Sequence, residues 1–168
     1  MRFTFRCNAF NNSGVQYRSR RLEKKRDNAW IVKGYQHEMR NEYKLPNVPG
    51  FICDERGEHG RLCLVRQIAE RKAEKITITA KSLIDQKKFT KFMKVDAWDE
   101  VVIVAQDNRI QHYLNGTRIL NFTDNHPELA LAEGIIALQL HAGKPMWAEF
   151  KDIKIRELDL NAACSEAA

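Results

Sequence analysis

Alternating apolar and polar residues run through most of the chain and predict short β-strands. Near the N-terminus, Phe3, Phe5 and Cys7 alternate with polar residues, and Val15 and Tyr17 do so in the next segment. A period of two places successive side chains on opposite faces of a strand, which is typical of a half-buried sheet. Similar patterns predict further strands at Ile31–Met39, Phe51–Cys53, Arg61–Val65, Ile76–Ala80, Val101–Gln106, Arg109–Asn115, Arg118–Phe122, Ile135–His141 and Ala148–Leu158.

Turn signals separate these strands and leave little room for helix. Asn115-Gly116 predicts a tight hairpin, because a type I′ turn needs positive φ at both central residues. Only Ser82–Lys94 and the tail after Glu157 have a helical rhythm. Many short strands with frequent turns predict an all-β antiparallel sandwich or barrel. We expect one domain over residues 1–158 and a frayed tail at 159–168.

Alternation alone leaves the inward face of each strand to be assigned. We expect the core to include positions from the strand near residue 102 and from the apolar strand near residue 138, together with a tryptophan. The expected core positions are Trp98, Val102, Val104, Leu138 and Leu140.

The composition is that of a folded globular domain. The chain has 168 residues, of which 43% are hydrophobic and 30% charged, and this excludes a disordered chain. It contains no apolar run of the roughly 18 residues that a membrane-spanning helix needs. The first ten residues, MRFTFRCNAF, lack the apolar centre of an export signal.

Positive charge is in modest excess, with 28 Lys and Arg against 22 Asp and Glu. A basic run from Arg18 to Arg26 is compatible with nucleic-acid binding, but it holds no aromatic residues that could stack on bases. A solvated loop between strands explains the run better, so we expect no nucleic-acid partner. The four cysteines form no Cys-x-x-Cys pair, and a zinc site is not predicted.

Three strands carry polar side chains at alternate positions, each on one face. Amides, a guanidinium, a carboxylate and an imidazole on one sheet face suit a sugar, whose hydroxyl groups need paired donors and acceptors. For any one of these side chains taken alone, the alternative to sugar binding is that it simply faces solvent. The residues are Gln16, Arg18 and Arg20; Gln36 and Glu38; and Gln139 and His141.

A second polar group closes the strand Phe51–Cys53. Asp54 and Glu55 are adjacent carboxylates, which can bind a divalent cation or act as acid and base. His112 lies within a predicted strand of its own. Aspartate and glutamate are common outside strand interiors, so this pair of carboxylates is by itself weak evidence for a functional site.

Six short sequence segments, taken in their order along the chain, resemble the 3-keto-disaccharide hydrolase domain family. The resemblance runs from about Phe3 to Leu158, and its specificity lies in the order of the segments rather than in any one of them. The segments are Asn12–Ser19, Gly34–Met39, Asp54–Gly57, Asn108–Gly116, Leu138–Gly143 and Phe150–Ile155.

The resemblance implies a fold and a substrate class. It implies a concanavalin-like jelly-roll sandwich with a sugar-binding face, usually in periplasmic or secreted bacterial proteins. The expected substrate is a 3-keto-glucoside, in which the ketone acidifies the proton on C2. A base removes that proton, the C1 oxygen leaves, and water adds to the resulting enone.

Face sharing and the resemblance together assign expected roles. Glu38 or His141 is expected to be the base and Arg18 to stabilise the enolate, and these three are expected to line one concavity. The remaining candidates are Gln16, Gln36 and Gln139 as hydroxyl binders, and Asp54, Glu55 and His112 for acid catalysis or a divalent cation.

Two questions stay open from the sequence. Members of the family usually have further strands before the one that Arg2–Cys7 resembles. The sequence is therefore a fragment, or a naturally short member, or a domain whose missing strands another chain supplies. In addition, a non-catalytic sugar-binding module is compatible with the same residues, because one fold serves many functions.

Overall fold

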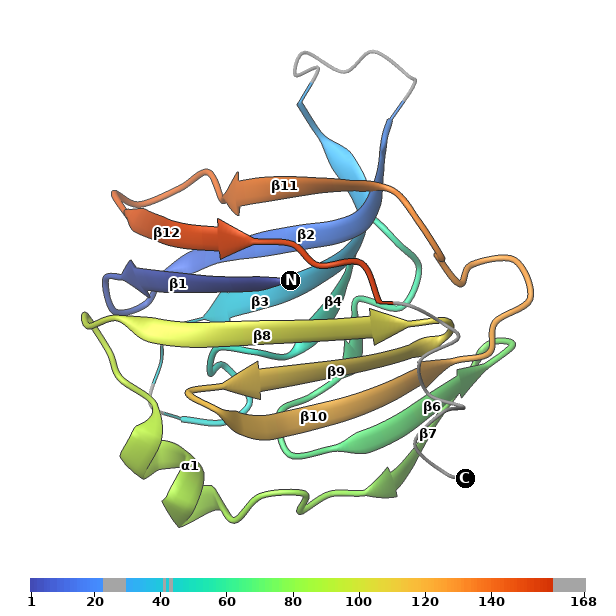
Figure 1. The fold of residues 1–168 in the computed structure, drawn as a ribbon, viewed down its shortest axis with the longest axis horizontal. Helices are drawn as coiled ribbons and strands as arrows, with labels where there is room; N and C mark the ends of the chain where they lie inside the picture. The colour runs from blue at the N-terminus through green and yellow to red at the C-terminus, as the bar shows by residue number, and fades with distance from the viewer. Residues whose placement is uncertain (23–29, 41, 43, 159–168) are drawn as a thin grey trace.

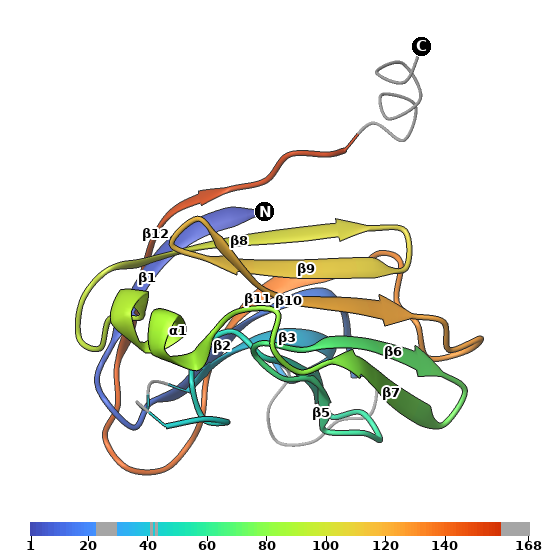
Figure 2. The ribbon, with the colours of Figure 1, turned by 90° about the horizontal axis from the view of Figure 1, so that it is seen from below.

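The computed structural model describes residues 1–22, 30–40, 42 and 44–158. Two sheets pack face to face over these residues and form a β-sandwich, as Figures 1 and 2 show. No helix in the described part of the chain is long and apolar enough to cross a membrane. Two expectations lie outside the described residues: the basic residues Lys24, Lys25 and Arg26, and the tail at 159–168.

The larger sheet has seven strands and the smaller has five. The order in the seven-stranded sheet is β12 (Ala148–Lys154), β1 (Arg2–Cys7), β8 (Asp99–Gln106), β9 (Arg109–Leu114), β10 (Thr117–Asp124), β6 (Ile68–Lys72) and β7 (Lys75–Ala80). The order in the five-stranded sheet is β11 (Ile135–Leu140), β2 (Asn12–Arg21), β3 (Val32–Arg40), β4 (Ile52–Glu55) and β5 (Arg61–Cys63).

The predicted turn and helix are confirmed. Asn115 and Gly116 have φ of 47° and 76°, as a type I′ hairpin turn between β9 and β10 requires. Helix α1 (Gln86–Phe92) lies within the predicted Ser82–Lys94, and the Asp85 side chain caps it by accepting from the backbone of the first turn. The pattern missed β6, which pairs parallel to β10, so the sandwich is antiparallel except for this one pair.

The core assignment along β8 was wrong by one residue. Val101 and Ile103 are buried, whereas Val102 and Val104 lie on the outer face and are half-buried. All four residues from Val101 to Val104 are apolar, so the sequence does not show which alternate pair faces the core. The pairing of Val101 with Phe3 on β1 decides this. Trp98 is also only half-buried, and its ring lies 4.0 Å from Lys151 Nζ.

The apolar strand β11 lies at a sheet edge, which corrects a second core expectation. Leu138 pairs with Val15, so Leu138 and Leu140 face the interior side as predicted. Nevertheless 52% of Leu138 and 53% of Leu140 stay exposed. An edge strand receives cover from only one neighbour, so inward direction does not guarantee burial.

A buried ion pair within the seven-stranded sheet is hydrogen-bonded to the five-stranded sheet. Arg71 on β6 donates to both carboxylate oxygens of Asp124 on β10, and both residues are almost fully buried. Tyr35 on β3 of the opposite sheet also donates to Asp124. Buried charges are tolerated only when they are paired and hydrogen-bonded in this way.

Two histidines face each other inside the core. The rings of His37 on β3 and His112 on β9 lie 4.9 Å apart, and neither residue is exposed. Nδ1 of His112 donates to the Gly50 carbonyl, 2.8 Å away, so its Nε2 accepts from the Tyr17 hydroxyl. Neither ring nitrogen of His37 has a hydrogen-bond partner among the described residues. Burial lowers the pKa of both histidines, for His112 to about 4.

These histidines predict acid sensitivity. The unfolded chain takes up a proton on His112 below pH 6.5, whereas the folded chain does so only near pH 4, so acid favours unfolding across that window. We expect the difference to cost about 3 kcal/mol of unfolding free energy between pH 7 and 4.

Urea titrations at several pH values measure this effect, with His112→Gln as the comparison. Buried Glu38 and Asp99 have a raised pKa, so acid favours the folded state through them. Both proteins contain these groups, so the difference between their slopes of unfolding free energy against pH isolates the effect of His112. Identical pH slopes in the two proteins would contradict the prediction.

Candidate functional site

A row of buried polar side chains crosses the outer face of the five-stranded sheet. Gln16 Nε2 on β2 donates to Gln36 Oε1 on β3 over 2.9 Å, and Gln36 Nε2 donates to Glu38 Oε2 over 2.7 Å. Gln16, Gln36 and Glu38 are only 3%, 1% and 5% exposed. Polar residues this deeply buried on an outer face are unusual, and the donor-to-acceptor chain fixes the orientation of the carboxylate.

Strand register brings further residues to this face. Gln139 on β11 pairs with Gly14 on β2, and Gly14 pairs with Glu38 on β3, so these positions form one cross-strand row. His141 follows two residues after Gln139, and its backbone N–H donates to the Asn12 carbonyl. The structure therefore places Gln16, Gln36, Glu38, Gln139 and His141 on one face, as strand parity predicts.

Gly14 leaves the space that the Gln36 side chain fills. A Cβ at Gly14 would lie 2.6 Å from Cγ and Cδ of Gln36. The side chain of Gln36 therefore passes directly over the glycine on its way to Glu38. The absence of a side chain at position 14 is what allows the hydrogen-bonded row to form.

The environment of Glu38 favours its neutral form more than water does. Burial raises the pKa of Glu38, while the hydrogen bond from Gln36 and the charge of Arg40 lower it in part. Arg40 Nε lies 3.3 Å from Glu38 Oε1. A carboxylate whose pKa is raised by burial is a stronger base than a carboxylate in water.

Two atoms on this face have unused hydrogen-bonding capacity among the described residues. Gln139 Oε1 and Arg40 Nε are buried and make no hydrogen bond, although Arg40 Nε contacts Glu38 as an ion pair. One is an acceptor and the other is a donor. A ligand rich in hydroxyl groups can satisfy both, because each hydroxyl donates and accepts.

Arg18 does not join this group, which corrects the expectation of one concavity for Arg18, Glu38 and His141. A β-bulge interrupts the pairing of β2 with β3 after Tyr17, and Arg18 has a φ of 49°. Its guanidinium donates to the carbonyls of Asp107 and Leu131 instead. The bulge shifts the alternation by one residue, and this turns the side chain away from Glu38.

Asp54 and His112 were expected in the candidate site, but both face the interior and are not part of it. Asp54 pairs with Tyr35 on β3 and forms an ion pair with Arg71, so it shares the inward face of the sheet. His112 lies in the core between Tyr17 and Gly50. Their hydrogen bonds and ion pairs maintain the packing of the two sheets.

Glu55 is half-buried on the outer face beside Gly34 and forms an ion pair with Arg56. Because Asp54 and Glu55 lie on opposite faces of β4, they cannot hold one divalent cation together. Within the described residues, no group of three or more His, Cys, Asp or Glu side chains is arranged to hold a metal ion.

Arg40 is a member of this site that was not predicted. It follows Glu38 by two residues on β3, so alternation places it on the same face, and Asn12 on β2 is its cross-strand partner. The signal was therefore present in the pattern that identified Gln36 and Glu38. Arg40 supplies the cation beside the carboxylate that Arg18 was expected to supply.

Gly14→Ala is expected to detach Gln36 from Glu38. The new Cβ would clash with a flexible side chain rather than with backbone, so the fold should survive with a cost of about 1 kcal/mol or less. The hydrogen bond from Gln36 lowers the pKa of Glu38, so losing it should raise that pKa further.

Carboxyl carbon NMR measures this pKa directly. The variant Gln36→Ala should raise the pKa of Glu38 in the same direction, and adding Gly14→Ala to it should cause no further rise. An unchanged pKa in the Gly14→Ala protein would show that the glycine does not control the row.

The comparison with known families gives an extended match. Residues 1–156 match the model of the 3-keto-α-glucoside-1,2-lyase-like domain. The chain belongs to this family. The match covers the whole described sandwich and confirms the resemblance seen in the sequence. None of the curated proteins compared with the chain matches it.

Proposed function

We propose that the outer face around Glu38 cleaves 3-keto-glycosides, by elimination across C1 and C2 followed by addition of water. The observation that carries the proposal is the buried, hydrogen-bonded Glu38 with its raised pKa, in a domain of the 3-keto-α-glucoside-1,2-lyase-like family. A carboxylate tuned in this way is suited to removing a proton from carbon next to a ketone.

The chemistry needs three functions from the protein. A base takes the proton from C2, and the electron pair moves to the C3 ketone oxygen as an enolate. The enolate then expels the C1 oxygen, which takes up a proton, and C1 and C2 become a double bond. Water adds oxygen to C1 and a proton to C2, and this completes net hydrolysis. Ordinary glycosidases pass instead through an oxocarbenium-like transition state between two carboxylates.

Glu38 is the proposed base, and two neighbours act on it. Gln36 donates a hydrogen bond of 2.7 Å to one carboxylate oxygen, and the other oxygen faces Arg40. Arg40 is half-buried, so its guanidinium can move from the carboxylate to the enolate oxygen as negative charge develops there. The role first expected of Arg18 passes to Arg40 in this proposal.

Polar groups farther along the face bind the rest of the sugar. Gln139 Oε1 accepts from a sugar hydroxyl, and Gln16 lies one strand away to contact another. His141 is exposed and lies diagonally from Glu38 across two strand spacings, about 12 Å between Cα positions by sheet geometry. At that separation His141 can protonate the leaving oxygen on the opposite side of the ring from the base.

Incubation with the 3-keto derivative of an aryl α-glucoside tests the proposal. We expect release of the aryl alcohol and detection of 2-hydroxy-3-keto-glucal or 3-keto-glucose by mass spectrometry. The corresponding glucoside without the ketone should not react, because its C2 proton is not acidic. Equal cleavage of the two compounds, or cleavage of neither, would contradict the proposal.

A non-catalytic sugar-binding domain is the second candidate. The observation that favours it is the low exposure of Glu38. Gln36 and Arg40 already occupy both carboxylate oxygens, which leaves little capacity to accept a proton from a substrate. Saturable binding of the 3-keto-glucoside without product formation would support this candidate over the first.

A further inference from the structure

Two arginines on the outer face of the seven-stranded sheet have no carboxylate beside them. Arg109 on β9 and Arg118 on β10 belong to neighbouring strands, which Figure 1 shows side by side. Among the residues that the structure describes, no Asp or Glu oxygen lies within 4.0 Å of either guanidinium. Glu70 on β6 lies two strands from Arg109 in the same cross-strand row, and it accepts from Asn125 instead. Two neighbouring cations without a counter-charge repel each other, and a bound anion removes this repulsion.

Both guanidiniums converge on the side-chain amide of Gln111 on β9. One terminal atom of this amide lies 3.1 Å from Arg118 Nη1 and 3.2 Å from Arg109 Nη2. Both neighbours are donors, so this atom is the amide oxygen, and the amide nitrogen then donates to the Tyr113 hydroxyl over 3.3 Å. Because both guanidiniums contact the same oxygen, one small anion can bridge them.

Asn121 on β10 fixes the position of Arg109. Its side-chain oxygen accepts from Arg109 Nε over 2.8 Å, and only 8% of Asn121 is exposed. Asn121 pairs with Gln111 across the two strands, and the guanidinium of Arg109 bridges their side-chain oxygens. A guanidinium held at two points keeps its remaining N–H groups in a fixed direction, which lowers the entropy cost of binding a ligand.

This cluster of side chains has more donors than acceptors. The oxygens of Gln111 and Asn121 accept from three guanidinium nitrogens, and the two arginines carry many more N–H groups than these contacts use. Within the described part of the chain, no other acceptor contacts either guanidinium. The Tyr113 hydroxyl accepts from Gln111 and keeps its own proton for a ligand. A ligand that fits here is therefore rich in acceptors and negatively charged.

We propose that the cluster of Arg109, Gln111, Tyr113, Arg118 and Asn121 binds a phosphate or sulfate group. Such a group offers at least three acceptor oxygens that point in different directions, which suits two guanidiniums and a hydroxyl. A carboxylate offers only two oxygens in one plane, and a single guanidinium satisfies both.

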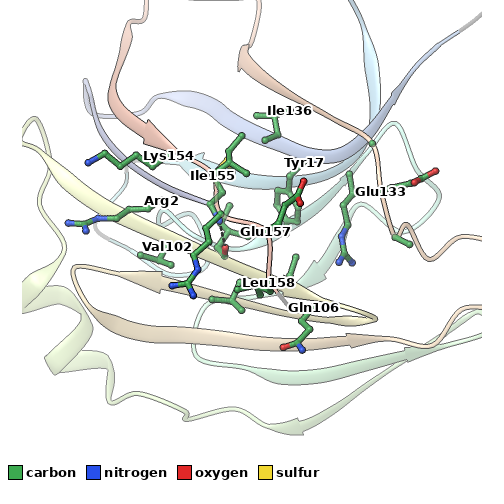
Figure 3. Close-up of a pocket in the computed structure, with 18 of the residues that line it drawn as sticks. Arg2, Tyr17, Val102, Gln106, Glu133, Ile136, Lys154, Ile155, Glu157 and Leu158 are labelled. Atoms are coloured by element: carbon green, nitrogen blue, oxygen red, sulfur yellow. Dashed lines mark hydrogen bonds between the residues drawn. The ribbon is translucent and has the colours of Figure 1, made fainter. Parts of the chain in front are cut away.

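The cluster is separate from the other surfaces of interest. Figure 3 shows a cavity of about 990 Å³ with Val102 and Gln106 of β8 in its wall, and none of the five cluster residues lines it. Glu38 belongs to the five-stranded sheet, on the other side of the sandwich. The anion site therefore does not depend on the role proposed for Glu38.

Nitrogen-15 NMR of the arginine Nε–H groups tests the proposal, with inorganic phosphate, inorganic sulfate and acetate as probes. We expect the Nε–H signals of Arg109 and Arg118 to shift saturably with phosphate and sulfate, with a Kd of about 1 mM. Acetate should bind at least about fivefold more weakly. Sodium chloride at equal ionic strength should give no saturable shift, because screening alone forms no complex.

Substitutions show whether the paired arginines make the site. Arg118→Gln should weaken phosphate binding at least about tenfold. Arg6→Gln is the matched control and should leave binding unchanged, because Arg6 lies on the same outer face but pairs with Glu149. Both variants should keep their thermal midpoint without phosphate within about 2 °C of the unmodified protein, since neither side chain is fully buried.

Phenyl phosphate distinguishes a free anion from an ester as the source of the group. Binding as tight as that of inorganic phosphate, or tighter, would support the proposal with an ester as the ligand, and weaker saturable binding would support it with the free anion. No saturable shift of the Arg109 signal with phosphate or sulfate would overturn the proposal. Equal binding of acetate, or equal binding of phosphate by Arg118→Gln, would also overturn it.

Discussion

Glu38→Gln is expected to lower turnover of a 3-keto-glucoside by about 10²- to 10⁴-fold, the usual range for removing a general base. Glutamine has nearly the same shape, and its amide oxygen can accept from Gln36 or from Arg40, but it cannot accept the C2 proton. Binding of the substrate should therefore change by no more than about threefold. The fold should be retained, because burial already disfavours the charged form of this side chain.

Steady-state kinetics over a range of pH measures the effect. Because burial raises the pKa of Glu38, activity of the unmodified protein should decline as pH falls through that raised pKa, where the base becomes protonated. Glu149→Gln is the matched control, since Glu149 is an exposed carboxylate on β12 that pairs with Arg6. Similar kcat values for Glu38→Gln and the unmodified protein would contradict the assignment.

Asp124→Asn is expected to cost about 3–5 kcal/mol of unfolding free energy, the usual effect of breaking a buried ion pair. The change leaves the guanidinium of Arg71 without its bidentate partner in a position where only 1% of the residue is exposed. Asp54, whose Oδ2 lies 3.7 Å from Arg71 Nη1, is too distant to replace two close hydrogen bonds. The Tyr35 hydroxyl also loses its charged acceptor.

Urea unfolding followed by tryptophan fluorescence measures the loss. Glu100→Gln is the matched control, because Glu100 pairs with Arg2 at the surface, where ion pairs contribute about 0–1 kcal/mol. A loss of less than 1 kcal/mol for Asp124→Asn would show that the buried pair does not stabilise the fold.

Local patterns predicted the sandwich well, because a period of two and the Asn115-Gly116 turn depend on nearby residues only. They failed where pairing between distant strands decides. The phase of β8 depends on its contact with Phe3, and the exposure of Leu138 depends on its place at a sheet edge. The parallel strand β6 is set by its pairing with β10, which local sequence does not encode.

The same division holds for the candidate site. Strand parity along β3 and β11 is sufficient to place Gln36, Glu38, Gln139 and His141 on one face, and the strand pairing agrees with it. Arg18 was misplaced because the bulge after Tyr17 leaves no clear mark in the sequence.

His112 and Asp54 were misassigned for a different physical reason. A polar side chain in a strand was taken to face solvent or a ligand, whereas both are buried with hydrogen-bonding or charged partners that lie far away in the sequence. For His112 these are Tyr17 and Gly50, and for Asp54 the partner is Arg71.

Solvent deuterium exchange at C2 of a 3-keto-glucoside tests the central claim, that Glu38 removes the C2 proton. In deuterium oxide, proton NMR should show the C2 signal disappearing or the substrate converting to product labelled at C2 in the presence of the unmodified protein. The rate should fall at least 100-fold with Glu38→Gln and stay unchanged with Glu149→Gln. Exchange at equal rates in all three proteins, or no label at C2 in the product, would contradict the account.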